Sequence, residues 1–393
     1  MAFYALFGVI TLFAGAALLR ILRVQISILT TPIIFVSALT ALLVNGRLLG
    51  FKLTEMGCAV LAVTAPLVAL GAISVYRERN ISRPEVLALI VSMTVPVISI
   101  FPYFRWGLAE YAGGSFWDGW NYTVYAQYLL DQSTGDGANS PLYLQFLATE
   151  MDKTRFAAAQ WIGLLSLALR GPDAFTGFGF YNAIASALFS STTALAAQSI
   201  WGNDWRVPAA AAIAGLGGVV ASVVQINNLD TLLLLAMGPA LFATSVLAKS
   251  DDLRSPVLFG LIAGTMVCVQ TEMVPLAALP AVMALLFKFD RPRWVRWISV
   301  ASLVCLVTCA LWLPTGWLWL FRQFGTLDMP IASRPGSGYF PALLTKECFL
   351  PSLWGFMGAY APCTSFTLRL IPAIALTALL LIGCVASTRQ RTL

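Results

Sequence analysis

The sequence predicts an all-α integral membrane protein, a polytopic bundle of about eleven transmembrane helices with an interfacial helix in its first large outer loop. Apolar residues make up 59% of the 393 residues and charged residues only 11%, and the mean hydropathy is +0.81. Soluble domains carry roughly 25% charged residues. The apolar residues also recur in continuous runs near the roughly 20 residues that a membrane helix needs, without the alternation of a barrel strand.

These runs predict the membrane spans in order along the chain. Four precede a long polar segment and seven follow it. The chain accordingly divides into a four-helix segment (1–104), a core with the outer loop and interfacial helix (105–313), an outer-face segment (314–367), and a last helix with its tail (368–393). The predicted spans are Ala2–Leu19, Ile26–Val44, Met56–Val75, Val86–Tyr103, Ala174–Ile200, Val207–Val224, Leu229–Ala248, Pro256–Val269, Met273–Phe287, Ile298–Leu313 and Leu368–Val385.

Clusters of lysine and arginine predict the orientation, because such clusters mark cytoplasmic ends of membrane helices. All the clusters fall on one side only if the apolar segment Phe156–Leu169, about 14 residues long, does not cross. We therefore expect this segment to lie in the outer interface. The N-terminus is then outside and the C-terminus cytoplasmic, in an inner (plasma) membrane. The clusters are Arg20 with Arg23, Arg77 with Arg79 and Arg83, Lys288 with Arg291, Arg293 and Arg296, and Arg389 with Arg391.

Composition also excludes several classes of chemistry. The chain has no histidine, which removes imidazole bases, histidine-ligated haem and the usual zinc sites. The net charge of +6 gathers in short connecting segments, so no nucleic-acid partner is expected. Five of the seven cysteines lie in apolar runs as small core residues. Cys348 and Cys363 lie outside such runs and can pair only if their loop faces an oxidising compartment.

The most informative polar stretch reads GSFWDGWNYTVYAQYLL and contains the lone carboxylate of Asp118. Its aromatic neighbours can keep water away from it, and a desolvated carboxylate can act as a general base. The simpler alternative is that Asp118 caps the helix that follows it. Trp117, Trp120 and Tyr122 can equally form an interfacial aromatic belt.

A second acid, Glu272, lies in VQTEMVP at the turn between two apolar runs. Three features follow one another in this part of the chain: an outward loop with an acid in WDGWNY, an interfacial helix, and a tight membrane hairpin bearing an acid. This order resembles that of the multispanning C-class glycosyltransferases. The resemblance covers roughly residues 105–313. It implies an inverting transfer from a polyprenyl-phosphate sugar to a glycan or lipid acceptor. It also implies that Asp118 deprotonates the acceptor hydroxyl and that Glu272 is the hairpin acid found in bacterial relatives.

Other residues of the outer segments are candidates for binding such a substrate. A phosphate leaving group needs fixed cations, and the forked guanidinium group suits it. Glu150 and Asp152 can supply a second acid or hold a divalent cation through oxygen ligands, or they can form an exposed charged turn. The sequence assigns no ligand residues to a metal ion beyond this pair and identifies no cofactor. The candidate substrate-binding residues are Arg105, Trp117, Trp120, Tyr122, Glu150, Asp152, Arg155, Arg322 and Arg334.

Two other functions stay open at this point. A transporter or flippase for a lipid-linked or small solute predicts charged residues buried within the membrane, with discontinuous helices around them. Glu272 is the best candidate for such a residue. A non-catalytic membrane subunit predicts that the same loops contact a partner protein.

Overall fold

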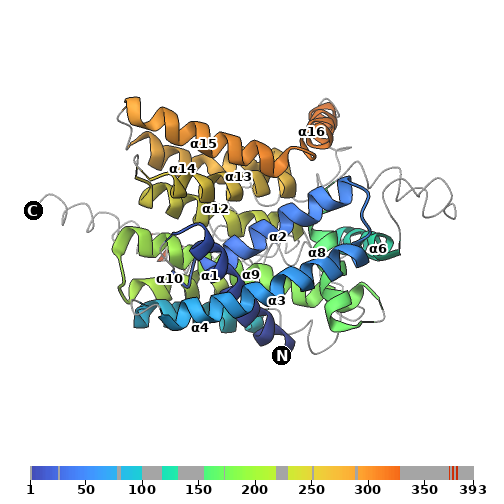
Figure 1. Ribbon diagram of the computed structural model, residues 1–393, viewed down its shortest axis with the longest axis horizontal. Coiled ribbons are helices and arrows are strands. Elements are labelled where there is room, and N and C mark those ends of the chain that lie inside the picture. Colours follow the sequence, from blue (N-terminus) through green and yellow to red (C-terminus); the bar gives the residue numbers. More distant parts are fainter. Residues whose placement is uncertain are drawn as a thin grey trace, which may run out of the picture.

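The part of the chain that a computed structural model describes consists of helices and the turns that join them, and no strand occurs there. The described residues are 2–24, 27–77, 81–99, 117–131, 155–171, 173–217, 229–249, 252–287 and 291–327, with positions 371, 374, 375 and 378. The helices (Figure 1) are α1 (Ala2–Ile21), α2 (Thr31–Leu48), α3 (Leu53–Arg77), α4 (Arg83–Ser99), α6 (Trp117–Asp131), α8 (Ala157–Leu169), α9 (Phe175–Trp201), α10 (Arg206–Leu216), α12 (Leu229–Leu247), α13 (Arg254–Gln270), the 3-10 turn η3 (Thr271–Met273), α14 (Val274–Leu286), α15 (Arg291–Cys309) and α16 (Leu313–Leu327).

The protein is a multi-pass membrane protein, as the composition predicts. Six stretches of the described residues are long and apolar enough to cross a membrane, and the bent pair α15–α16 raises the number to seven. The predicted count of about eleven is therefore not confirmed. The six stretches are Phe3–Ile21, Thr31–Leu48, Leu53–Arg77, Phe175–Trp201, Leu229–Leu247 and Arg254–Leu286.

In the last of these stretches, 33 residues long, the 3-10 turn η3 separates α13 from α14. Along α13, Gly260 lies against Ala301 and Gly264 lies against Thr308, so α13 and α15 run in the same direction. The intervening α14 must therefore run back, and η3 is the turn of a hairpin. This turn contains Glu272, in agreement with the hairpin expected from the sequence.

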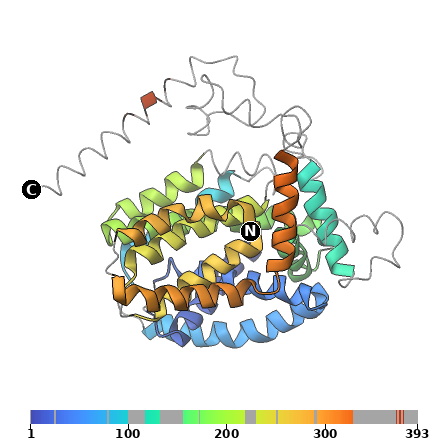
Figure 2. The same ribbon diagram turned by 90° about the horizontal axis from the view of Figure 1, so that it is seen from above.

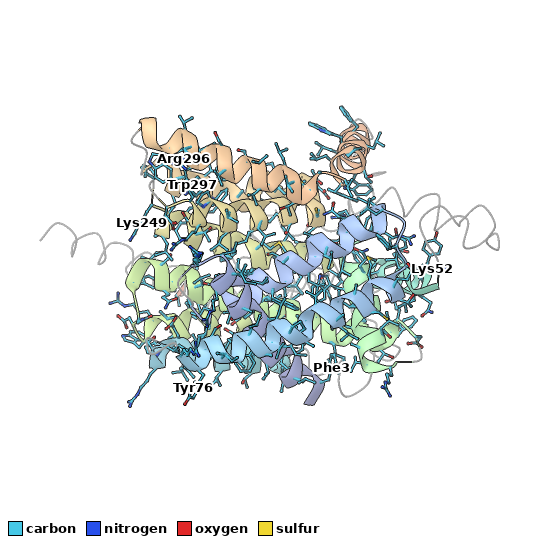
Figure 3. All side chains as sticks on the ribbon, viewed as in Figure 1. Phe3, Lys52, Tyr76, Lys249, Arg296 and Trp297 are labelled. Atoms are coloured by element: carbon cyan, nitrogen blue, oxygen red, sulfur yellow. The ribbon has the colours of Figure 1, made fainter. Side chains whose placement is uncertain are left out.

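Helix ends rich in basic residues gather at one end of the bundle, which we call the basic end. Arg20 at the end of α1 donates to Ser74 Oγ near the end of α3 at 3.1 Å. Trp297 near the start of α15 donates to Ser255 Oγ near the start of α13 at 3.0 Å. Figure 3 shows Arg296 and Lys249 at this end and Lys52 at the opposite one. The described basic clusters thus share one end of the bundle, as the orientation rule predicts.

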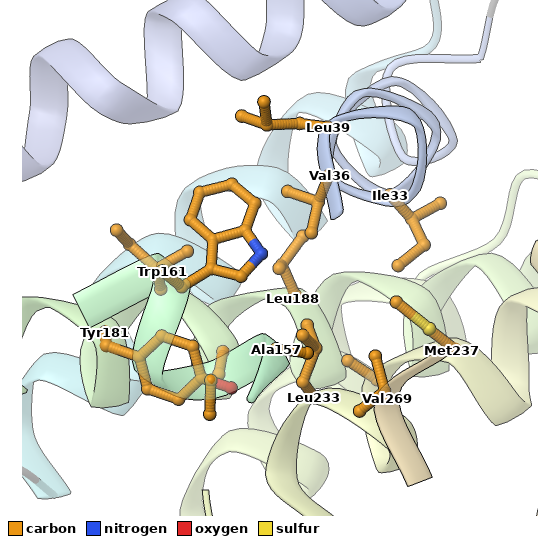
Figure 4. Packing of buried hydrophobic residues seen from close by; sticks show 14 of the residues in the cluster. Ile33, Val36, Leu39, Ala157, Trp161, Tyr181, Leu188, Leu233, Met237 and Val269 are labelled. Atoms are coloured by element: carbon orange, nitrogen blue, oxygen red, sulfur yellow. The ribbon is translucent and has the colours of Figure 1, made fainter. Parts of the chain in front are cut away.

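The core lies between α2, α8, α9 and α12, where large apolar side chains interlock (Figure 4). Trp161 of α8 is 2% exposed, and its indole N–H donates to Thr40 Oγ1 of α2 at 2.8 Å. Helix α9 approaches α8 closely at Gly177, where a Cβ would overlap the carbonyl oxygen of Ile162. This close packing fixes the position of α8, whose first residues enter the candidate site.

Helix α8 differs from the expected interfacial helix in one respect. Its 13 residues are too few to span a membrane, as predicted. A helix lying in the lipid interface exposes one face, however, and nine residues of α8 are buried among the neighbouring helices. The segment is apolar on all its faces, and that pattern is typical of a helix enclosed by protein. Whether α8 lies at the depth of the outer interface stays a prediction.

Candidate functional site

The carboxylate of Asp230 lies at the end of the bundle opposite to the basic end, with 0% of its side chain exposed. It is in the first turn of α12. Tyr122 of α6 donates its hydroxyl hydrogen to Oδ2 at 2.8 Å. The Ala158 backbone N–H donates to Oδ1 at 3.1 Å, and Arg155 Nε lies 3.6 Å from Oδ2. A buried carboxylate needs such partners, because removing its charge from water is costly.

Asp230 also caps the N-terminus of another helix. The N-cap residue of α8, Phe156, has no side chain that can accept a hydrogen bond, so the first N–H groups of α8 need another acceptor. Asp230 provides it through Ala158, and its negative charge lies where the helix dipole favours an anion. One carboxylate therefore joins α6, α8 and α12.

Arg155 connects Asp230 to the acid of the hairpin turn. Its Nη1 donates to Glu272 Oε1 at 3.0 Å, while its Nε faces Asp230. The side chains of Arg155 and Glu272 are 19% and 20% exposed, in contrast to the fully buried Asp230. The guanidinium group is thus shared between a buried carboxylate and one that water can reach.

Helix α16 closes one side of this group. It turns by 83° from α15, and Figure 2 shows it lying across the direction of α15. Trp319 of α16 donates its indole N–H to Glu272 Oε2 at 3.1 Å, and the Arg155 guanidinium lies 5.4 Å from its ring centroid. That distance is within the range of a cation–π contact. We call Tyr122, Arg155, Asp230, Glu272 and Trp319 the acid–arginine cluster.

The structure brings together three of the residues predicted from the sequence, namely Tyr122, Arg155 and Glu272. Asp118 lies in the first turn of α6, and its role as a helix cap or as a general base stays a prediction. The side chains of Trp117, Asp118 and Trp120 in α6, and of Arg322 in α16, lie outside the described part of the structure. Arg105, Glu150, Asp152, Arg334, Cys348 and Cys363 lie outside the described residues.

Two members of the acid–arginine cluster were not among the predicted site residues, although the sequence places the corner that contains Asp230 on the outer side. Asp230 begins an apolar run, where an acid is usually a cap of its own helix, and no local pattern indicates that it serves α8. Trp319 lies in WLWLF among other aromatic residues, and the sequence does not say which indole meets the acid. The N-terminus of α8, which lacks a capping side chain, was the available signal that a distant acceptor is needed.

The Arg155 guanidinium group is the part of the acid–arginine cluster that can bind an anion. Within the described ranges, no group of three or more aspartate, glutamate or cysteine side chains is placed to hold a metal ion. A guanidinium group that two carboxylates orient is instead a fixed cation with a planar set of donors. Phosphate and carboxylate groups are the ligands that match this geometry.

A cavity of about 930 Å³ lies at the basic end of the bundle, away from the acid–arginine cluster. The ends of α9 and α12 and the starts of α4 and α13 surround it, together with the segment that joins α1 to α2. Its lining combines apolar side chains with hydroxyl, amide and charged groups, such as Ser27, Glu85 and Gln198. The two ends of the bundle therefore differ in both shape and charge pairing.

Comparison of the chain with family models, with curated proteins and with solved structures found no match.

Proposed function

We propose that the chain is a membrane glycosyltransferase that moves a sugar from a polyprenyl-phosphate donor to an acceptor hydroxyl on the outer face. In this proposal the full chain crosses the membrane about eleven times, with its N-terminus outside and its C-terminus in the cytoplasm. The acid–arginine cluster then faces outward, and the basic end faces the cytoplasm. The proposal extends the resemblance seen in the sequence to the geometry of the folded chain.

One observation carries the proposal. The three elements of the resemblance are the loop helix with Asp118, the short helix that follows Arg155, and the hairpin with Glu272. Hydrogen bonds and ion pairs through Tyr122 and Asp230 join these three elements into one continuous set of contacts. Asp118 precedes Tyr122 by four residues in α6, and positions four apart share one face of a helix. The position of Asp118 is thus one turn from this set of contacts.

The residues then have the following roles. Asp118 takes the proton of the acceptor hydroxyl as its oxygen attacks the anomeric carbon. The bond between that carbon and the phosphate oxygen breaks, and polyprenyl phosphate leaves. Arg155 stabilises the negative charge that develops on the leaving phosphate. No separate redox partner or metal ion is needed to balance this step.

A donor phosphate reaches Arg155 by replacing Glu272. The Glu272 side chain is 20% exposed and sits on a turn, whereas Asp230 is fully buried and also caps α8. Displacing Glu272 therefore costs less than displacing Asp230, because Glu272 can be solvated after it is released. Glu272 holds the guanidinium group in position before the donor arrives.

The decisive experiment measures sugar transfer from a labelled polyprenyl-phosphate sugar by the purified chain in proteoliposomes. Asp118→Asn removes the base and keeps the size of the side chain, so we expect transfer to fall by about 100-fold or more. Glu55→Gln is the matched control, since Glu55 is an acid in the first turn of another helix and lies at the cluster end. Unchanged transfer by Asp118→Asn would show that the base assignment is wrong.

A transporter or flippase is the second candidate, and the cavity at the basic end favours it. A cavity at one end and a tightly paired set of charges at the other are features of a protein that opens to one side at a time. Solute flux into proteoliposomes, lost in Glu272→Gln and accompanied by no covalent sugar product, would favour this function over transfer.

A further inference from the structure

The cavity at the basic end has the dimensions of a ligand site. Its volume of about 930 Å³ lies within the 300–1,000 Å³ that is typical of small-molecule pockets. Helix ends form its walls, so it is reached from the aqueous side of the bundle and not through the middle of the apolar spans. The acid–arginine cluster lies at the other end, and this site is therefore independent of the proposed transferase reaction.

The two carboxylates that line the cavity are already used by helix N-termini. Glu85 accepts hydrogen bonds from the backbone N–H and the hydroxyl of Ser82, both at 3.0 Å, in the reciprocal arrangement of a capping box. Its other oxygen accepts from the Ser27 hydroxyl at 3.0 Å. Asp252 accepts from the Arg254 backbone N–H at 3.0 Å. Both carboxylates are therefore held in place by donors at the start of a helix.

The two cations that line the cavity have no such partners. Lys249 and the side chain of Arg254 are exposed. Among the described residues, no carboxylate oxygen lies within 4.0 Å of either charged group. Both charged groups can therefore make charge-assisted hydrogen bonds to an anion in the cavity.

The facing wall presents uncharged hydrogen-bonding groups. Gln198 near the end of α9 donates to Asn203 Oδ1 at 2.6 Å, and its own carbonyl oxygen lies 3.4 Å from the Ser27 hydroxyl oxygen. In the described part of the chain, the Asn203 amide nitrogen donates to no acceptor. This wall can therefore bind hydroxyl or ester oxygens attached to the anion.

We propose that this cavity binds a phosphate-bearing polar ligand, with Lys249 and Arg254 holding the phosphate. Asn203, oriented by Gln198, binds the polar groups next to it. A phosphate fits because Arg and Lys donors make charge-assisted hydrogen bonds to its oxygens. The headgroup of an anionic phospholipid and a soluble phosphate ester share this chemistry, and the two sources are distinguished by experiment.

For the soluble source, the purified full chain in phosphatidylcholine nanodiscs is titrated with glycerol phosphate, and the thermal midpoint is recorded. We expect a ligand-dependent rise, because a ligand that binds only the folded state stabilises it. Lys249→Gln combined with Arg254→Gln should weaken binding by about tenfold or more, since two charge-assisted contacts are lost. For the lipid source, no soluble ligand is added, and the chain is placed in nanodiscs that contain phosphatidylglycerol. The thermal midpoint should then rise more for the wild type than for the double variant.

Arg206→Gln is the matched control for both arms. Arg206 is likewise an exposed arginine in the first turn of a helix that begins just after α9, but it pairs with Asp204 at 3.7 Å and does not line the cavity. Midpoints recorded without ligand show that each variant folds. A ligand effect lost in the double variant and kept in Arg206→Gln supports the site. No effect from either source, or an equal loss in both variants, overturns it.

Discussion

The two ends of the bundle handle charge in opposite ways. At the cluster end, Asp230 is fully buried and Arg155 contacts it and Glu272. At the basic end, Lys249 and Arg254 are exposed beside a cavity, and no described carboxylate oxygen lies within 4.0 Å of their charged groups. The difference follows from burial, because a buried charge without partners is costly and an exposed one is solvated. At the cluster end, a ligand must therefore displace Glu272 to reach Arg155, whereas the unpaired cations at the basic end are directly available to a ligand.

The largest effect that distinguishes the two ends is expected from Arg155→Met. This change leaves Asp230 buried without its cation, so we expect the free energy of unfolding to fall by roughly 3–5 kcal/mol. Unfolding in detergent micelles, followed by tryptophan fluorescence, measures it. Arg254→Met at the basic end should change stability by less than about 0.5 kcal/mol. Equal losses in the two variants would contradict the comparison, and adding Asp230→Asn to Arg155→Met should restore part of the stability.

A smaller effect is expected from Tyr122→Phe, which removes one hydroxyl donor from Asp230 and keeps the ring. The carboxylate then loses a buried hydrogen bond, and stability should fall by about 1–3 kcal/mol. The same unfolding measurement applies. Tyr76→Phe is the control, because Tyr76 is 91% exposed near the basic end and its loss should have no measurable effect. A neutral Tyr122→Phe would mean that Arg155 and the α8 backbone are sufficient for Asp230.

The smallest effect is a local one, expected from Trp319→Leu. It removes the indole donor to Glu272 and the ring beside Arg155, together worth about 1 kcal/mol at a partly exposed site. Hydrogen exchange of the α16 amides should become about fivefold faster while global stability changes little. Trp317→Leu is the control, since Trp317 is 58% exposed and, among the described residues, its ring stacks on Phe321 of the same helix. Equal acceleration in both variants would show that Trp319 does not hold α16.

Much of the fold was predictable from two features of the sequence, namely its continuous apolar runs and the positions of its basic residues. The membrane class, the hairpin around Glu272 and the shared end of the described basic clusters follow from them. The enclosure of α8 was predictable too, because its sequence has no polar face. The sequence places α8 in the interface only because the basic clusters then share one side of the membrane. That reasoning tells whether a segment crosses the membrane, and it does not tell what surrounds the segment.

The candidate site was predictable only in part. Arg155 and Glu272 are charged residues beside apolar runs, and a charged residue at membrane depth indicates a functional site. Their contact with each other, and the contact of Tyr122 with Asp230, depends on how distant helices pack. Asp230 looks like an ordinary helix cap in the sequence. Its partners lie in α6 and α8, and only the folded chain joins them.

The cap that Asp230 supplies to α8 has a consequence for how the protein is made. The capped amide belongs to a residue that leaves the ribosome 72 residues before its acceptor does. Until α12 has been synthesised and inserted, the first turn of α8 has free N–H groups at the edge of an apolar environment. The arrival of α12 is therefore the step that completes α8, and biogenesis of this end of the protein is expected to stall in chains truncated before residue 230.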